Sequence, residues 1–335
     1  MTPPDFFIVV LSYNGLEDTR KCLTSLAPAM RPGATALLVD NGSTDGTYEA
    51  VGAEFPWCGR LRVEVNRGPA AGNNAGINAA LDAGAEWILL LNNDTIVDPA
   101  LLDRLREATA AHPGFDVMGP VILFMDDPTE VMSDGTQFNP AIPRGFFLRI
   151  TVPLGKSHPP QITPVDVVNG ACLAIKAETI RRIGLFDEAF FIYHDESDLC
   201  LRAIEAGGQP GIIDHALVWH KGSATFQVAG KKSARYYDIR NLLYLLRKHR
   251  WAPRHGRPRR VTMWVYLKYA YYWYCFEREQ GFDDSAAGVI EGLHDGIAGR
   301  QGRYEPKRSR WLGPLRLAFE LARRRPRQNR AGLQT

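Results

Sequence analysis

Apolar and polar positions alternate in blocks along the first third of the chain. Continuous apolar runs rich in β-branched residues are typical of strands that are buried on both faces of a sheet. Four such runs predict strands, at residues 6–12, 36–40, 61–65 and 87–91. The stretches that follow each run predict helices, at residues 16–29, 47–55, 70–83 and 99–111. Strands that alternate with helices indicate βαβ units and a parallel sheet.

A polar loop follows each of these four strands. The loops read SYNG, DNGSTDGT, NRGPAAGNN and NNDT, and they begin at Ser12, Asp40, Asn66 and Asn92. The carboxyl ends of parallel strands lie at one edge of the sheet, where ligands bind in such folds. One loop of this kind is ordinary turn chemistry. Four of them at the same edge predict a polar binding site.

A later run, FDEAFFIYHDESDLCLR at residues 186–202, places five carboxylates in an apolar and aromatic stretch. Carboxylates avoid such surroundings unless they are paired, bound to metal or used in chemistry. We expect Asp195, Glu196 and Asp198 in the first turn of a helix, whose dipole favours ionised carboxylates. They are candidate general bases, with an acidic helix cap as the alternative. Asp198 and Arg202, four residues apart, are expected to pair.

Length and cysteine content bound the class of protein. The 335 residues are enough for one catalytic domain and an appendage. The five cysteines show no CxxC spacing, which favours reduced thiols in the cytoplasm over a disulfide framework or a zinc site. No basic segment precedes the first apolar run, so we expect no signal peptide. Residues 126–164 are rich in Pro and Gly and are expected to form a long loop region.

The formal net charge of +3 hides an asymmetry between two parts of the chain. Residues 1–230 hold 16 Lys and Arg against 28 Asp and Glu, a net charge of −12. Residues 231–335 hold 24 against 9, a net charge of +15. The acidic first part argues against nucleic-acid binding. In the basic part, arginine-rich segments at 247–260 and 323–330 flank the aromatic run VTMWVYLKYAYYWYCF at 261–276.

The aromatic run is too short to span a bilayer and carries Lys268. Tyr and Trp beside Arg clusters suit a membrane interface, and anionic lipids attract basic segments. We therefore hypothesise peripheral attachment to the inner face of the cell membrane. The alternative is a helical appendage whose aromatic side chains pack on the catalytic domain or on a second subunit of a homodimer.

Seven short segments occur along the chain in an order that is characteristic of one protein family. They are LSYNG (11–15), VDNGSTDGT (39–47), NRGPAAGNNAGI (66–77), LLNNDT (90–95), NGACLAIK (169–176), FDEAFFIYHDESDLCLR (186–202) and WHKGSAT (219–225). The ordered set closely resembles glycosyltransferase family 2, the inverting, metal-dependent enzymes of the GT-A fold that use nucleotide sugars. Within the family it is most similar to bacterial rhamnosyltransferases and related enzymes of cell-surface polysaccharide synthesis.

The resemblance implies an α/β GT-A fold, with a Rossmann-like, mostly parallel central sheet flanked by helices. It implies a nucleotide-sugar half at about residues 1–115, an acceptor half at about 116–230 and a basic helical extension at 231–335.

The resemblance assigns the donor site to the strand-end loops. Asp40 would accept a hydrogen bond from the N3–H of uracil or thymine, with an Asx-turn as the alternative reading. The residues that flank the base and ribose would be Leu11, Ser12 and Asn14. The next wall would be formed by Asn66, Gly68, Ala71, Gly72 and Asn73, whose small members let backbone approach the nucleotide.

Asn92, Asn93 and Asp94 occupy the place of the family's aspartate-rich metal motif. The departing diphosphate needs a cation, and oxygen ligands suit Mg²⁺ or Mn²⁺. The resemblance implies metal binding by Asp94, completed by His220 in WHKGSAT. The two asparagines depart from the fully acidic motif, so tight metal binding is expected only when the diphosphate supplies further oxygens.

The acidic pair Asp195–Glu196 inverts the family's usual Glu-Asp order. Position in the motif indicates Glu196 as the base, whereas residue type indicates Asp195, and we favour Glu196. Adjacent helical residues point about 100° apart, so one of the two faces the acceptor hydroxyl. Asn169, Gly170 and Ala171 match the family's acceptor loop, with a buried strand and tight turn as the alternative.

These assignments predict transfer of a sugar with inversion to a saccharide or polyprenyl-linked acceptor. Rhamnose from dTDP-rhamnose is favoured, and UDP-sugars come next. A nucleotidyltransferase would want a basic glycine-rich loop near the N-terminus, which LSYNGLEDT is not. A non-catalytic nucleotide- or sugar-binding module would need no base. A dinucleotide dehydrogenase is poorly supported, since no G-x-G-x-x-G follows the first strand.

Overall fold

The first half of the chain folds as alternating strands and helices. A computed structural model describes residues 2–138, 147–222, 231–249, 259–306 and 311–324. Its opening elements are β1 (Phe6–Ser12), α1 (Leu16–Leu26), the 3₁₀ turn η1 (Ala27–Ala29), β2 (Ala34–Asp40), α2 (Thr47–Glu54), β3 (Gly59–Arg62), α3 (Pro69–Asp82) and β4 (Trp87–Asn92). The predicted order of strands and helices is therefore confirmed.

The third strand lies about two residues earlier than predicted. Its ladder with β2 runs parallel and ends at the pair Asp40 and Arg62. Beyond Asp40 the chain turns into a polar loop, so residues 64 and 65 have no strand to pair with. The run at residues 61–65 marked the right region, and the length of the partner strand decided where β3 ends. β3 is an edge strand and is mostly exposed, so the expectation that this strand is buried on both faces is wrong.

The second half of the chain completes the sheet. It contributes β5 (Thr95–Val97), α4 (Leu101–Ala111), β6 (Val117–Phe124), β7 (Val131–Ser133), β8 (Thr136–Phe138), β9 (Phe147–Arg149), β10 (Ile162–Pro164), β11 (Cys172–Lys176), α5 (Ala177–Ile183), α6 (Asp195–Glu205) and β12 (Pro210–His220). In the described residues the main sheet runs in the order β10-β12-β6-β11-β4-β1-β2-β3, with β5 on β12 and β7 on β6. β3, β2, β1 and β4 are parallel, whereas β11 runs antiparallel between β4 and β6.

The expectation of a long loop at residues 126–164 is wrong in part. This stretch contains β7, β8, β9 and β10, each of three residues. β7 and β10 extend the main sheet, and β8 pairs with β9 in a small second sheet. Strands of three residues are shorter than the four to eight over which alternation can be recognised.

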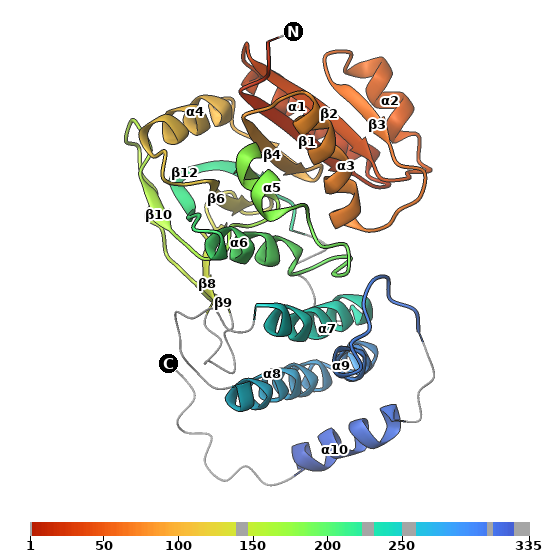
Figure 1. The fold of residues 1–335 in the computed structure, drawn as a ribbon. Helices are drawn as coiled ribbons and strands as arrows, with labels where there is room; N and C mark the ends of the chain where they lie inside the picture. The colour runs from red at the N-terminus through yellow and green to blue at the C-terminus, as the bar shows by residue number, and fades with distance from the viewer. Residues whose placement is uncertain (1, 139–146, 223–230, 250–258, 307–310, 325–335) are drawn as a thin grey trace.

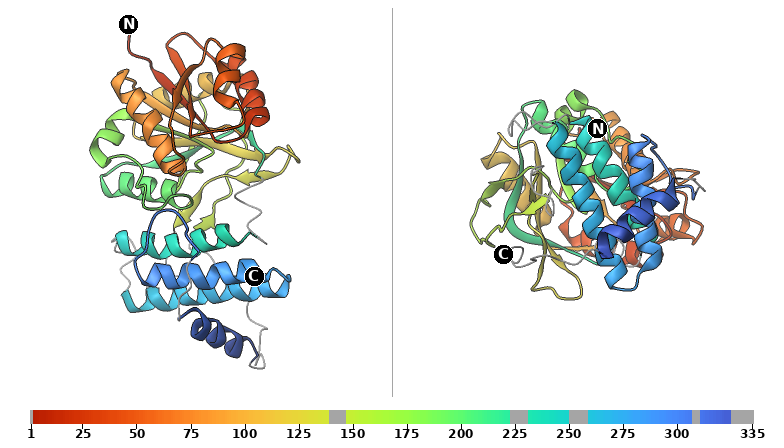
Figure 2. Two further views of the ribbon diagram at one scale, coloured as in Figure 1. Left: turned by 90° about the vertical axis from the view of Figure 1, so that its right-hand side faces the viewer. Right: turned by 90° about the horizontal axis from the view of Figure 1, so that it is seen from below.

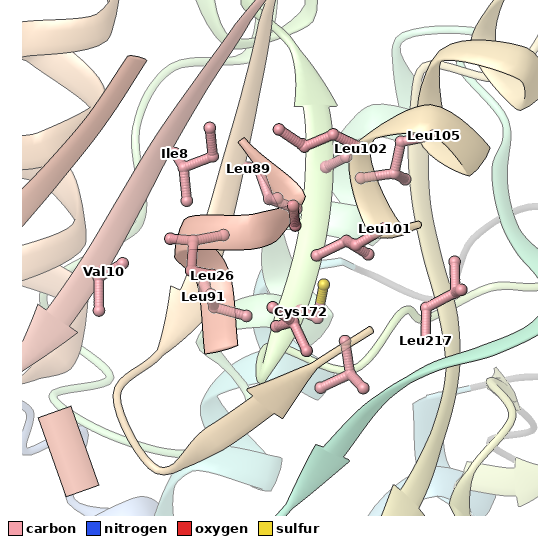
Figure 3. Close-up of a cluster of buried hydrophobic side chains, with 14 of the residues drawn as sticks. Ile8, Val10, Leu26, Leu89, Leu91, Leu101, Leu102, Leu105, Cys172 and Leu217 are labelled. Carbon is pink, nitrogen blue, oxygen red and sulfur yellow. The ribbon is translucent and has the colours of Figure 1, made fainter. Parts of the chain in front are cut away.

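Both faces of the sheet are buried. Along β1, Phe6, Ile8 and Val10 belong to one core, and Phe7 and Val9 belong to the other. Helices α1 and α4 cover the first face, while α3, α5 and α6 cover the second. Part of the first core is drawn in Figure 3, where leucines of α4 lie beside those of β4. This two-sided burial explains why the strands read as continuous apolar runs.

Helices α7 (Lys232–Lys248), α8 (Arg259–Glu279), α9 (Asp283–Ile297) and α10 (Leu312–Arg324) form a stack below α6 (Figures 1 and 2). A third core joins Ile239, Leu242 and Val289 of this stack to Phe190 and Leu201 of the preceding region. Parts of two arginine-rich segments (250–258 and 325–330) and residues 223–225 of WHKGSAT lie outside the described residues.

The aromatic run forms much of α8, and several of its side chains point inward. Tyr266 and Tyr274 are buried in the third core, while Trp264 is 60% exposed. Most of the run therefore packs on neighbouring helices, chiefly those of the extension itself rather than on the sheet domain or a second subunit. Across the described residues, no helix combines the length and the apolarity needed to cross a bilayer.

Candidate active site

The strand-end loops meet a turn and a helix from the second half of the chain around one cleft of about 540 Å³. Its lining includes these predicted site residues: Leu11, Asn14, Asn66, Asn73, Asn92, Asn93, Asp94, Asn169, Gly170, Ala171, Asp195, Glu196 and His220. Residues separated by more than 200 positions in sequence thus share one concave surface. Such a polar cleft at the carboxyl ends of the strands is the expected place for a ligand.

Five predicted residues lie behind this lining rather than in it: Ser12, Asp40, Gly68, Ala71 and Gly72. The two glycines are required by close packing. A Cβ on Gly68, which has φ +100°, would lie 2.6 Å from the Phe191 carbonyl oxygen. A Cβ on Gly72 would lie 2.4 Å from Leu11 Cδ1. Their lack of side chains therefore lets neighbouring segments approach closely behind the cleft lining.

Asp40 is fully buried at the end of β2. Its Oδ1 accepts a hydrogen bond from the Ser43 backbone N–H at 3.2 Å, so the side chain holds the turn that follows it, a local role like the one in the alternative reading. Its Oδ2 has no hydrogen-bond partner among the described residues and lies 3.6 Å from Arg62 Nε. A buried carboxylate oxygen without a donor is uncommon, and it leaves Asp40 able to accept one more hydrogen bond.

Asp94 and His220 come together because β5 pairs with β12. That antiparallel ladder sets His220 opposite Thr95, the residue after Asp94. As a result, Asp94 Oδ1 lies 2.9 Å from His220 Nε2 at the cleft. The other ring nitrogen of His220 lies 3.3 Å from Met132 Sδ.

This pair is the candidate metal centre. No group of three His, Cys, Asp or Glu side chains able to hold a metal gathers in the part of the chain that the structure describes. One carboxylate and one imidazole fit a divalent cation whose remaining ligands are substrate oxygens. The side-chain nitrogen of Asn93 donates to Thr19 Oγ1 at 2.9 Å and Ser12 Oγ at 3.2 Å, so only the amide oxygen of this side chain could bind a cation.

Asp195 and Glu196 open helix α6, as the sequence predicts. Burial raises the pKa of Asp195 well above its usual value, and the neighbouring Glu196 charge raises it further. Burial also raises the pKa of Glu196. The expectation that the helix N-terminus favours the ionised forms is therefore wrong for this pair, because loss of hydration outweighs that effect. A carboxylate with a raised pKa is a stronger proton acceptor, which suits a general base.

The NGA turn faces the second of these acids. A Cβ on Gly170 would lie 3.5 Å from Glu196 Cβ, so the turn passes directly over that side chain. The Asn169 side chain accepts a hydrogen bond from the Ala171 N–H at 2.9 Å, which closes the turn. The tight turn of the alternative reading is therefore real, and it lies on the cleft.

Asp198, the third acid of α6, has a structural role. It is fully buried and receives hydrogen bonds from Arg202 Nε at 2.8 Å, His249 Nε2 at 2.9 Å and Lys248 Nζ at 2.9 Å. Burial raises the pKa of Asp198, but these partners outweigh burial and lower it to about 2. The expected pair with Arg202 is confirmed, and two further partners come from the end of α7.

The sequence did not predict the unusual backbone conformation of the segment that leads into α6. Phe191, Tyr193 and His194 have φ of 66°, 67° and 66°. This is a left-handed backbone conformation that residues other than glycine rarely adopt. Such residues cost roughly 1–3 kcal/mol each and concentrate at functional sites. The first two also line the cleft. The residue types FIYH carry no turn signal, so only the three-dimensional structure reveals this feature.

Family models match most of this architecture. Residues 7–160 match the model described as Glycosyl transferase family 2, and residues 87–277 match Glycosyl transferase family group 2. The chain belongs to glycosyltransferase family 2, and it is a glycosyltransferase, as the ordered motifs predict.

Three relatives with named activities are similar to this chain in sequence. An N-acetylglucosaminyl-diphospho-decaprenol L-rhamnosyltransferase of Mycobacterium tuberculosis is 28% identical over 232 residues, 64% of this chain and 75% of the relative. The dTDP-rhamnosyl transferase RfbF of Shigella flexneri is 24% identical, over 73% of this chain and 81% of RfbF. The galactofuranosyltransferase GlfT1 of Mycolicibacterium smegmatis is 24% identical, over 89% of this chain and 97% of GlfT1. The predicted likeness to rhamnosyltransferases is confirmed.

Solved structures agree on the fold. S. aureus TarS, residues 1–349, superposes with a TM-score of 0.56 at 14% identity, over 97% of this chain and 93% of that chain. GalNAc-T7 crystallised with UDP, GalNAc and Mn²⁺ superposes with a TM-score of 0.54 at 14% identity, over 74% of this chain and 55% of that chain. The expected GT-A fold, with a central sheet between helices, is thereby confirmed.

Proposed function

We propose that this glycosyltransferase moves rhamnose from dTDP-rhamnose, with inversion, to a saccharide carried on a polyprenyl diphosphate in cell-surface polysaccharide synthesis. The observation that carries this proposal is the single cleft in which the Asp94–His220 pair and the Asp195–Glu196 pair meet. The names of the relatives support the sugar and the acceptor, since one acts on a decaprenol-linked saccharide and another is a dTDP-rhamnosyl transferase.

The donor lies across the strand-end loops. The Oδ2 of Asp40, which lacks a hydrogen-bond donor among the described residues and lies 3.6 Å from Arg62 Nε, would accept the N3–H that thymine and uracil share. Asn14 and Asn73, which line the cleft, offer polar groups to the ribose and the diphosphate. Asp94 and His220 would hold a divalent cation, Mn²⁺ or Mg²⁺, which supplies positive charge to the departing diphosphate.

The acceptor enters over the NGA turn. The Glu196 carboxylate removes the proton from the acceptor hydroxyl as its oxygen attacks the anomeric carbon. The bond from that carbon to the nucleoside diphosphate breaks in the same displacement, so the configuration inverts. Asp195, the more strongly perturbed acid, keeps its proton and prevents two adjacent buried charges.

A donor panel tests the proposal. The purified chain is incubated with dTDP- and UDP-sugars, with Mn²⁺, Mg²⁺ or EDTA, and with a polyprenyl-linked N-acetylglucosamine acceptor. We expect dTDP release from dTDP-rhamnose that EDTA and Asp94→Ala abolish. Turnover of UDP-galactofuranose alone would overturn the donor assignment and retain the enzyme class. Nucleotide binding without turnover of any donor would favour a non-catalytic binding module.

We also propose that the helical extension touches the cytoplasmic leaflet of an anionic membrane. On α10, Leu317 and Leu321 are more than half exposed and lie one turn apart. Arg316 and Arg323 come from the same helix, and residues 231–335 carry a net charge of +15. Exposed leucines among arginines suit the interface of a bilayer, where a polyprenyl-linked acceptor would be found.

A further inference from the structure

Helix α7 contacts the strained segment that carries the acidic pair. In Figures 1 and 2 it lies between α6 and the remaining helices of the stack. The segment holds three residues in left-handed conformations immediately before Asp195. Such a conformation persists only where surrounding contacts determine it. Three side chains of α7 provide those contacts: Asp238, Arg240 and Asn241.

Asn241 is the central contact. Its side-chain nitrogen donates to the carbonyl oxygens of Phe190 at 2.9 Å, Ile192 at 2.7 Å and Tyr193 at 3.0 Å. The two hydrogens of this amide are thus shared among three backbone acceptors, of which the Phe190 carbonyl oxygen also accepts from Arg240. The side chain is 1% exposed, so water cannot replace it without opening the structure.

Arg240 orients that amide. Its Nε donates to Asn241 Oδ1 at 2.8 Å, which leaves the Asn241 nitrogen directed at the segment. Its guanidinium also donates to the Phe190 carbonyl oxygen at 2.9 Å. Arg240 is buried as well, and its guanidinium lies over the rings of Tyr236 and Tyr237 on the same helix.

Asp238 holds the other end of the segment. Its Oδ1 lies 3.1 Å from Nε2 of His194, the residue immediately before α6. Its Oδ2 accepts a hydrogen bond from the Tyr269 hydroxyl of α8 at 3.1 Å. The helical extension therefore reaches the first turn of α6 through a chain of hydrogen bonds.

We propose that α7 is a clamp that fixes the backbone of residues 190–194, and that Asn241 and Asp238 are positioning residues for the acidic pair. The clamp holds the cleft side of α6 in one conformation, so that the base faces the acceptor hydroxyl. Its catalytic consequence rests on the function proposed above, whereas its effect on the backbone does not. On this view the extension completes the active site, in addition to any contact with a membrane.

The test compares full-length wild type, Asn241→Ala and the control Tyr236→Phe. Tyr236 lies on the same helix. The substitution keeps the ring over which the Arg240 guanidinium lies and removes only the buried hydroxyl, which donates to Asp295 Oδ2 on α9. We expect Asn241→Ala to lower kcat about a hundredfold, the effect of a displacement near 1 Å, with little change in donor KM. Amide hydrogen exchange over residues 189–196 should accelerate, while exchange over residues 6–12 should not. Tyr236→Phe should leave both unchanged.

Three outcomes would decide against the clamp or separate it from the proposed function. Wild-type kcat and wild-type exchange in Asn241→Ala would overturn the clamp. An equal rise in exchange over residues 6–12 would show general destabilisation and would also overturn it. An inactive wild type would refute the proposed function alone, because exchange still tests the clamp. Where Asn241→Ala does not fold, Asp238→Asn, which keeps the shape of the side chain, carries the same expectations.

Discussion

At the residue scale, the two adjacent acids of α6 differ in their surroundings. Glu196 faces the NGA turn, whereas Asp195 is nearly fully buried and has the more strongly raised pKa. Because the pKa is raised in both acids, loss of the second proton from the pair is disfavoured. One ionised and one protonated carboxyl is the arrangement that this environment favours.

We predict that Glu196→Gln lowers kcat by about 10²–10⁴-fold, the usual contribution of a general base. Asp195→Asn should lower it less. Because burial raises the pKa of Glu196, the acidic limb of the wild-type pH–rate profile should lie above 4.5, the ordinary value for a glutamate. Steady-state kinetics from pH 5 to 9 give both results. A larger loss in Asp195→Asn would transfer the role of base to Asp195.

The lowered pKa of Asp198 leads to a prediction about the stability of the fold. Its carboxyl pKa is lowered from 3.8 to about 2, so its ionised form stabilises the fold above pH 4, and this stabilisation is lost as the pH falls towards 2. We expect Asp198→Asn to lose about 2 kcal/mol at pH 7 and progressively less at pH 3. Urea denaturation at the two pH values measures this.

The matched control is Asp103→Asn, which removes an ion pair with Arg31 at the surface. Exposed pairs contribute little, so a change within about 0.5 kcal/mol is expected at either pH. A loss in Asp198→Asn that does not vary with pH would contradict the assigned cause, because it would point to packing rather than to charge.

At the element scale, α7 and α9 approach closely because glycines line their contact. A Cβ on Gly288 would lie 2.3 Å from the Lys232 carbonyl oxygen, and a Cβ on Gly292 would lie 2.5 Å from the Tyr236 carbonyl oxygen. Both distances are shorter than van der Waals contact. Backbone atoms cannot move aside as side chains can, so the helices would have to separate.

We predict that Gly292→Ala destabilises the protein by about 1–3 kcal/mol, the usual cost of overpacking. Thermal unfolding followed by circular dichroism measures it. Gly313→Ala is the control, since a Cβ on this glycine of α10 would meet no other part of the described chain within 4 Å, and alanine favours helices. Equal stability of the two variants would refute the close approach of α7 and α9.

At the scale of the whole molecule, an acidic catalytic part is joined to a basic helical extension. The contacts between them include Lys248 with both Asp187 and Asp198. Side chains of opposite charge thus pair at the junction, and the two parts as a whole also have net charges of opposite sign. Helix α10, which carries the exposed Leu317 and Leu321, lies at the far end of the stack from the sheet (Figure 1).

We predict that the full chain sediments with vesicles containing anionic lipid and not with neutral vesicles. Binding should weaken as salt rises, because the attraction is electrostatic. Leu317→Ser with Leu321→Ser should reduce it, while Tyr236→Phe serves as the unchanged control. Loss of membrane binding should leave turnover of a water-soluble acceptor intact. Vesicle binding that does not depend on lipid charge would contradict the proposal. A dimer that dissociates in the double variant would also contradict it.

The linear pattern determined the first four strands, the helices that follow them and the edge where polar loops gather, but not the long strands β6 and β12. Those features depend on periodicity and on the burial of continuous apolar runs, which are local properties of the chain. The ordered motifs likewise identified the family and most of the residues that line the cleft. Short strands such as β7 and β10 escaped prediction, because three residues carry too little pattern.

Only the tertiary structure decided how distant segments act on one another. The β5–β12 ladder brings His220 to Asp94, and burial overrides the helix N-terminus at Asp195. The hydrogen bonds from Asn241 to the segment before α6 join residues 48 to 51 positions apart. Contacts of this kind depend on the packing of whole elements, and no local sequence pattern encodes them.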